Sequence, residues 1–147
     1  MEDIIRVTGD VTLTITYLDG RIETVHLRNL VVNNGKTILS RLLGHDGSYT
    51  GEYVNQIAFG TGSTPASVGD TALEAQVLAK EATVTYPAFN KVMFSATMQA
   101  NEGGSNTYRE IGLLSAGSNG LFSRLVIAPI GKTSLYMIKV DWTISFQ

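Results

Sequence analysis

The 147-residue chain contains no cysteine, which excludes disulfide bonds, thiol catalysis and thiolate metal sites. It has only two histidines, His26 and His45, and they stand at no recognisable zinc-site spacing from carboxylates. The serines lie in no GxSxG sequence, the elbow that carries the nucleophile of many hydrolases. We therefore predict a protein that is not an enzyme and that uses no cofactor or metal.

Charge and long apolar runs are also scarce. Charged residues make up 16% of the chain, below the roughly 25% of typical soluble domains, and the formal net charge is −2. The lysines and arginines are scattered, so we expect no nucleic-acid partner. No apolar run approaches membrane-spanning length and the first residues, MEDIIRVTGD, do not resemble a signal peptide, so we expect no membrane. The low charge has two open explanations: a β-rich surface of Thr, Ser and Asn, or a surface partly covered by other subunits.

The strongest pattern in the sequence lies at residues 136–146, YMIKVDWTISF, where apolar and polar residues alternate without exception. This period of two is typical of a strand with one buried face. The pattern places six apolar side chains together, including the only tryptophan: Tyr136, Ile138, Val140, Trp142, Ile144 and Phe146. Because nothing follows Gln147 in the sequence to cover this strand, we expect it to pair between two earlier strands.

Shorter patterns predict the other elements. Residues 11–17 and 21–27 alternate around Asp19-Gly20, which predicts a hairpin. A short amphipathic helix is expected from residue 36 to Gly44, capped by Asn33 or Asn34, and we expect it to cover one open end of the sheets. Further strands are expected at residues 54–59, 79–86, 91–100, 108–115 and 120–127. The whole chain, residues 1–147, is predicted to be one all-β domain, a mainly antiparallel β-sandwich or jelly-roll-like fold of about eight strands with one short helix.

Residues 60–70, GTGSTPASVGD, are rich in glycine and hydroxyl residues and predict a loop. Asp70 is then expected to cap a helical turn over residues 71–77. Phosphate binding by this loop is disfavoured, because no lysine follows the glycines as a P-loop requires. We predict instead a structural or subunit-contacting role, with these candidate contact residues: Gly60, Thr61, Gly62, Ser63, Thr64 and Pro65.

Two other polar regions carry residue types that can bind a ligand. Asp46 and Glu52 could hold calcium only weakly, because their spacing does not match an EF-hand, and a solvated loop is the better explanation. Tyr49, Tyr53 and Tyr108 lie in or beside polar loops, where an aromatic ring can stack on a sugar. They are the candidate residues for contact with a glycan, although half-buried tyrosines that cover the core explain the same pattern.

Four segments of the chain resemble small virion proteins of tailed bacteriophages: residues 31–44, 54–77, 109–133 and 141–146. The most distinctive parts are the block FGTGSTPASVGDTAL and the sequence EIGLL followed by LFSRLV. The resemblance implies a non-enzymatic structural subunit of the tail, tail fibre or baseplate. It would assemble in the host cytoplasm with copies of itself, as a trimer or hexamer, and with other virion proteins. A capsid decoration or head-fibre protein and a module that binds host-surface glycan are the alternatives.

Overall fold

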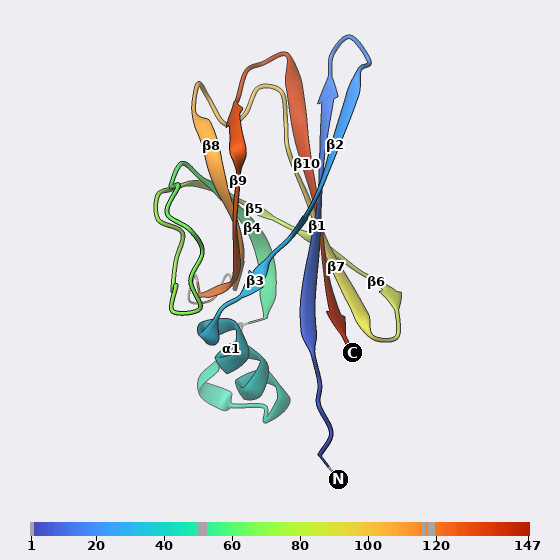
Figure 1. Ribbon diagram of the computed structural model, residues 1–147, viewed down its shortest axis with the longest axis vertical. Helices are drawn as coiled ribbons and strands as arrows, with labels where there is room; N and C mark the ends of the chain where they lie inside the picture. The colour runs from blue at the N-terminus through green and yellow to red at the C-terminus, as the bar shows by residue number, and fades with distance from the viewer. Residues whose placement is uncertain (1, 50–52, 116, 118–119) are drawn as a thin grey trace.

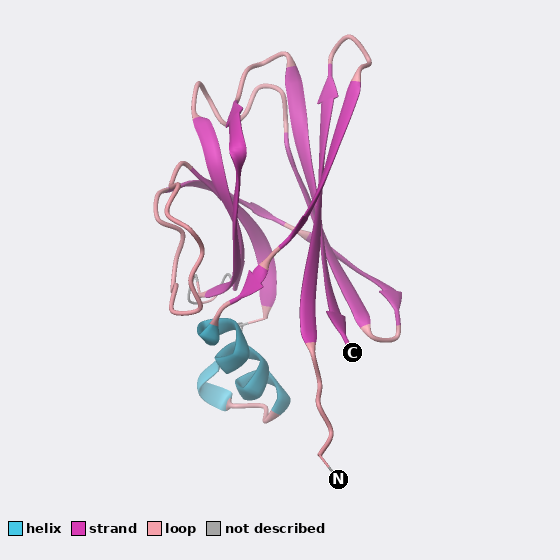
Figure 2. Ribbon diagram, in the orientation of Figure 1, coloured by secondary structure: helices cyan, strands magenta, loops and turns pink. Residues whose placement is uncertain are grey.

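The computed structural model describes residues 2–49, 53–115, 117 and 120–147. Within these residues, two antiparallel five-stranded sheets pack face to face, with a helix at one end (Figures 1 and 2). Sheet A has the spatial order β2 (Ile22–Arg28), β1 (Val7–Tyr17), β10 (Tyr136–Phe146), β7 (Lys91–Met98) and β6 (Thr83–Ala88). Sheet B has the order β3 (Leu30–Val31), β9 (Leu121–Gly131), β8 (Thr107–Ser115), β4 (Val54–Gly60) and β5 (Gln76–Glu81). The predicted all-β sandwich is confirmed, with ten strands in the described residues instead of about eight.

Strand β10 lies between β1 and β7, as its alternating sequence predicts. It pairs with β1 along its whole length, from Tyr17 opposite Tyr136 to Val7 opposite Phe146. Trp142 is completely buried in the core between the sheets, where each large apolar side chain contributes about 1.5–3 kcal/mol. The predicted inner face is confirmed, and Phe146 at its end is half-buried.

The β1–β2 hairpin also forms as predicted. Gly20 in its turn has φ +93°, a left-handed conformation that glycine adopts without a steric penalty. After β3 the chain enters helix α1 (Asn33–Leu43), which Gly44 follows at the predicted position. The predicted Asn cap is wrong, because Val32 stands at the N-cap and the Asn34 side chain instead donates to the Leu121 carbonyl at 3.0 Å. A short 3₁₀ turn, η1 (Gly47–Tyr49), comes after the helix.

Helix α1 packs against β9 and buries Gly35 and Ile38. It lies at one end of sheet B and covers only part of the open end of the sandwich (Figure 2). It is too short to span a membrane, as is every other helix in the part of the chain that the structure describes.

Residues 71–86 differ from the sequence-based prediction in two ways. No helical turn forms over residues 71–77; the chain stays irregular until β5 begins at Gln76. The predicted single strand at 79–86 is two strands, β5 and β6, which belong to opposite sheets. The chain crosses between the sheets at Ala82, whose N–H donates to the Asn55 carbonyl at 2.7 Å. This stretch therefore forms one edge of each sheet.

The loop of residues 61–75 folds back over the outer face of sheet B. Leu73 is its apolar anchor and packs in a small cluster outside the main core. The other buried members of this cluster come from β4, β8, β9 and the residue before α1: Ala58, Leu114, Leu121 and Val32. As a result, side chains on the outer face of β8 and β9 are covered by the chain itself.

Candidate functional site

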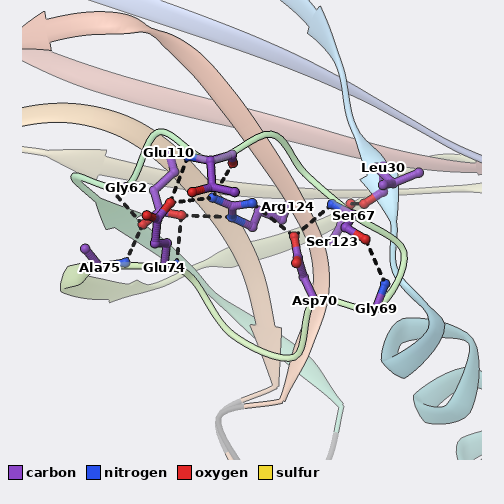
Figure 3. Close-up of polar contacts among 11 residues, drawn as sticks. Leu30, Gly62, Ser67, Gly69, Asp70, Glu74, Ala75, Glu110, Ser123 and Arg124 are labelled. Atoms are coloured by element: carbon purple, nitrogen blue, oxygen red, sulfur yellow. Dashed lines mark hydrogen bonds and ion pairs between the residues drawn. The ribbon is translucent and has the colours of Figure 1, made fainter.

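Two charged side chains lie beneath the 61–75 loop, Glu110 on β8 and Arg124 on β9 (Figure 3). Successive side chains of a strand point to opposite faces, so Ile111 and Leu113 enter the core while Glu110 faces outward. The loop covers that outer face, and the exposed fractions of Glu110 and Arg124 are only 0% and 2%. Charges buried this deeply are tolerated only when they are paired and hydrogen-bonded.

The guanidinium of Arg124 meets both conditions. Its Nε donates to Oε2 of Glu110 at 2.8 Å. Nη1 donates to Oδ2 of Asp70 at 3.0 Å, and Nη2 donates to the carbonyl of Thr64 at 2.9 Å. Glu74 completes the group, with Oε2 3.7 Å from Nη2. Arg124 thus joins both ends of the loop to sheet B.

The carboxylate of Glu110 is satisfied by the loop backbone as well as by Arg124. Oε1 accepts the N–H of Gly62 at 3.1 Å and the N–H of Ala75 at 2.7 Å. Oε2 accepts the N–H of Glu74 at 3.0 Å. Hydrogen bonds from both ends of the loop therefore converge on one buried carboxylate, which fixes the loop on the sheet.

The two acids of the loop bond to its own backbone. Glu74 accepts the N–H of Thr64 at 2.8 Å, and this bond, followed by the charge of Arg124, lowers the pKa of Glu74. Asp70 accepts the N–H of Ser67 at 2.9 Å, and this bond together with Arg124 lowers the pKa of Asp70. Burial alone would lower the pKa of Arg124, but the hydrogen bonds that its guanidinium donates to Glu110 and Asp70 outweigh this effect and raise that pKa. Asp70, Glu74 and Arg124 are therefore charged at neutral pH.

The glycines of the loop allow close approach to these groups. A Cβ on Gly62 would lie 2.6 Å from Oε1 of Glu110, and a Cβ on Gly60 would lie 2.6 Å from the carbonyl of Ala75. The N–H groups of Gly62, Thr64 and Ser67, which could otherwise meet a phosphate, donate to the protein's own carboxylates. This arrangement explains the glycine-rich sequence without a bound anion.

The predicted contact residues of the loop separate into two groups. Gly60 and Gly62 are buried and Thr61 is half-buried, so they support the loop from below. Ser63, Thr64 and Pro65 are exposed. A partner would therefore meet the loop at residues 63–65.

The three candidate glycan-contact tyrosines also separate. Tyr108 is completely buried, packs edge-on against Phe59 and donates its hydroxyl to the Gly103 carbonyl at 2.7 Å. It has no surface to offer a sugar, and this part of the prediction is corrected. Tyr53 is exposed. The side chain of Tyr49 lies outside the described part of the structure.

The described side chains that could serve metal binding or catalysis do not come together in one site. Asp46 accepts hydrogen bonds from the N–H and hydroxyl of Ser48 and from Arg41, and these bonds, Ser48 first, lower its pKa. Glu52 lies outside the described residues. His26 pairs with Thr12 on the exposed face of the hairpin, with 3.1 Å between Nδ1 and Oγ1. Among the described residues, no group of three or more His, Asp or Glu side chains could hold a metal ion.

Sequence analysis did not find the buried pair of Glu110 and Arg124. Alternation along β8 groups Glu110 with the aromatic Tyr108, and alternation along β9 groups Arg124 with the aromatic Phe122, so the local pattern marks neither as part of a polar face. The available signal was an acid and a base on neighbouring strands beside a glycine-rich loop, but that pattern does not show that the loop covers them.

Comparison with known proteins adds no relative, since no family model, curated protein or solved structure matches the chain.

Proposed function

We propose that this chain is a non-enzymatic structural subunit of a tailed-bacteriophage virion. It assembles with copies of itself and with other virion proteins in the tail, tail fibre or baseplate. The observation that carries the proposal is the fixed conformation of the 61–75 loop, which contains most of the distinctive phage-like block. The loop's carboxylates and the buried Glu110 beneath it are bonded to Arg124 and to the loop backbone, so residues 63–65 offer a partner a fixed shape. A fixed loop loses little conformational entropy when it docks.

The free edges of sheet A support assembly through strands. β2 stands at one end of the strand order, and all but one of its residues are exposed. Ile22 and Val25 are exposed apolar residues on this strand. An edge strand with free N–H and C=O groups can pair with a strand of another chain, and a repeated contact of this kind closes a ring.

The outer face of sheet A supports one explanation of the low content of charged residues, namely a β-rich surface of uncharged polar side chains. β1 and its neighbours place small hydroxyl side chains on that face, among them Thr12, Thr14, Thr16, Thr24, Thr97 and Thr143. The face also carries Lys139 and Asp141, which form an ion pair at 3.5 Å. A surface of hydroxyl groups costs less to desolvate than a surface of charged groups, so the same face is also suited to contact with another subunit.

Immunogold electron microscopy of the phage that encodes the chain tests the proposal. We expect the label at the tail, tail fibre or baseplate of intact particles. Label on the head would favour the capsid decoration or head-fibre alternative, and particles without label would contradict both.

The variant Thr64→Arg places a bulky charge on the exposed part of the loop and should reduce incorporation into particles. Its matched control, Ser134→Arg in the exposed turn before β10, leaves the loop unchanged and lies outside the proposed contacts.

The exposure of Tyr53 keeps glycan binding as a second candidate function. An exposed tyrosine ring can stack on a sugar ring. Binding on a glycan array that is lost in the variant Tyr53→Ala would favour this function. An array without signal, under conditions in which a known lectin binds, would remove it.

A further inference from the structure

An apolar groove of about 580 Å³ lies between helix α1 and the β6–β7 hairpin. Its walls come from α1, from the hairpin and from the ends of β9 and β10, and include Leu39, Leu42, Tyr86, Phe89, Phe122 and Phe146. Phe89 at the hairpin turn is fully exposed, and Tyr86 is largely exposed. The helix thus leaves part of this end of the sandwich uncovered. Contiguous apolar surface of this kind commonly marks an interaction site.

The same end of the molecule carries an exposed segment, residues 2–6, which contains two adjacent isoleucines and which we call the arm. Arg6 continues the pairing of β1 with β10 by exchanging two backbone hydrogen bonds with Gln147. Before Arg6 the chain has no regular structure and runs beyond the end of the sheets (Figure 1). Ile4 and Ile5 are 81% and 74% exposed. Exposing two adjacent isoleucine side chains to water costs free energy. Burying them against another apolar surface would therefore be favourable.

We propose that the arm of one copy of this chain occupies the groove of a second copy, and that the exchange is reciprocal. The groove is lined mainly by apolar residues, which suits Ile4 and Ile5. Lys91 is the one charged residue among the described residues that line it, which suits the acidic pair Glu2 and Asp3. The arm therefore matches the groove in both hydrophobicity and charge.

The position of the two features favours a second copy as the occupant. The arm and the groove lie at the same end of the molecule, so a twofold axis at that end places each arm against the partner's groove. The four residues before Arg6 span about 13–14 Å when extended, enough to reach a neighbouring subunit. The inference deepens and rests on the proposed function, because it names one self-contact of an assembling subunit.

The test compares a double arm variant, Ile4→Asp/Ile5→Asp, with a double groove variant, Tyr86→Ser/Phe89→Asp, by sedimentation velocity. Wild-type protein should associate as its concentration rises. Each variant alone should associate at least about tenfold more weakly, because burying a large aliphatic or aromatic side chain is worth roughly a factor of ten or more in affinity. The matched control, Leu135→Ser, removes an exposed apolar residue from the opposite end and should associate like wild type.

A mixture of the two variants gives the decisive result. The arm variant keeps an intact groove and the groove variant keeps an intact arm, so the mixture should form a heterodimer that neither variant forms with itself. A charge exchange, Lys91→Glu combined with Glu2→Lys and Asp3→Lys, should retain association, whereas Lys91→Glu alone should weaken it.

Three outcomes would overturn the inference. Arm and groove variants that associate as strongly as wild type would overturn the inference. Assembly through other contacts would then account for the association. A mixture of variants that stays monomeric would show that the two features do not bind each other. Wild-type protein that stays monomeric as its concentration rises would also overturn the inference. The immunogold labelling of intact particles tests the proposed function independently of these three outcomes.

Discussion

Arg124 is the residue on which the conformation of the 61–75 loop depends most directly. The variant Arg124→Met should lower the free energy of unfolding by about 3–5 kcal/mol, because it leaves the buried carboxylate of Glu110 without its cation. The control is Arg28→Met, which removes an exposed arginine 3.8 Å from Asp10 and should cost less than about 1 kcal/mol. Urea denaturation measures both values. Equal losses in the two variants would contradict the structural role of Arg124.

The acids of the same cluster predict how stability depends on pH. The pKa values of Asp70 and Glu74 are lower in the folded protein than the ordinary 3.8 and 4.5, so these groups bind fewer protons when folded. They therefore stabilise the fold above pH 4.5, and this stabilisation is lost as the pH falls through their folded pKa values. The double variant Asp70→Asn/Glu74→Gln should have a flatter stability curve below pH 4.5 than wild type. Urea midpoints measured across this range test the prediction, and identical slopes would contradict it.

At the scale of elements, local pattern was enough to predict β10 and the β1–β2 hairpin. Every second residue of β10 is apolar, and this pattern alone identifies which face enters the core. The hairpin needs only two alternating segments and the Asp19-Gly20 turn between them. Both elements are determined by residues close together in the sequence, and this is why sequence analysis found them.

Contacts between distant residues explain the errors. Asp70 and Glu74 stand at the spacing of a helix start, but their partner Arg124 is 54 residues beyond Asp70 and holds them in an irregular loop. The run of residues 79–86 has no local break, and the change of sheet at Ala82 depends on its bond to Asn55. Alternation along β9 likewise groups Arg124 with the apolar Phe122, so it shows neither that the arginine faces outward nor that a loop covers it. The candidate site was therefore predicted as a loop, but its buried support was not.

Helix α1 provides a test in which packing opposes helix propensity. Replacing a glycine inside a helix by alanine usually stabilises the helix by about 1 kcal/mol. A Cβ on Gly35, however, would overlap the carbonyl group of Phe122 on β9, whose carbon would lie 3.1 Å away. Backbone cannot move aside as a flexible side chain can, so the overlap should cost about 1–3 kcal/mol. We expect Gly35→Ala to lower the stability, by up to about 2 kcal/mol when both effects are combined.

Chemical denaturation and amide hydrogen exchange measure this effect. The exchange of α1 should accelerate in Gly35→Ala more than that of β10, because the overlap separates the helix from β9. The control, Ser40→Ala, lies on the exposed side of the helix and should change the stability by no more than about 0.5 kcal/mol. A stabilised Gly35→Ala protein would show that α1 does not pack closely on β9.

At the scale of the whole molecule, the two proposed contacts use different surfaces. The edge strand β2 lies along the side of sheet A, whereas the arm and the groove lie at the α1 end of the sandwich. A reciprocal contact at one end closes with two copies, whereas a repeated edge contact continues until a ring closes. The two contacts should therefore be separable by mutation.

The variant Ile22→Lys/Val25→Lys places two charges on the free edge of β2, where lysine prevents strand pairing between chains. If the edge contact builds the ring, assembly of this variant should stop at the dimer made by the arms. The arm variant should instead keep the species joined through β2. Light scattering of both variants measures the masses, with Leu18→Lys, in the turn beyond the strand pair, as the control. An edge variant that assembles to the wild-type mass would contradict a role for β2, because two lysines on the pairing edge should prevent another strand from pairing there.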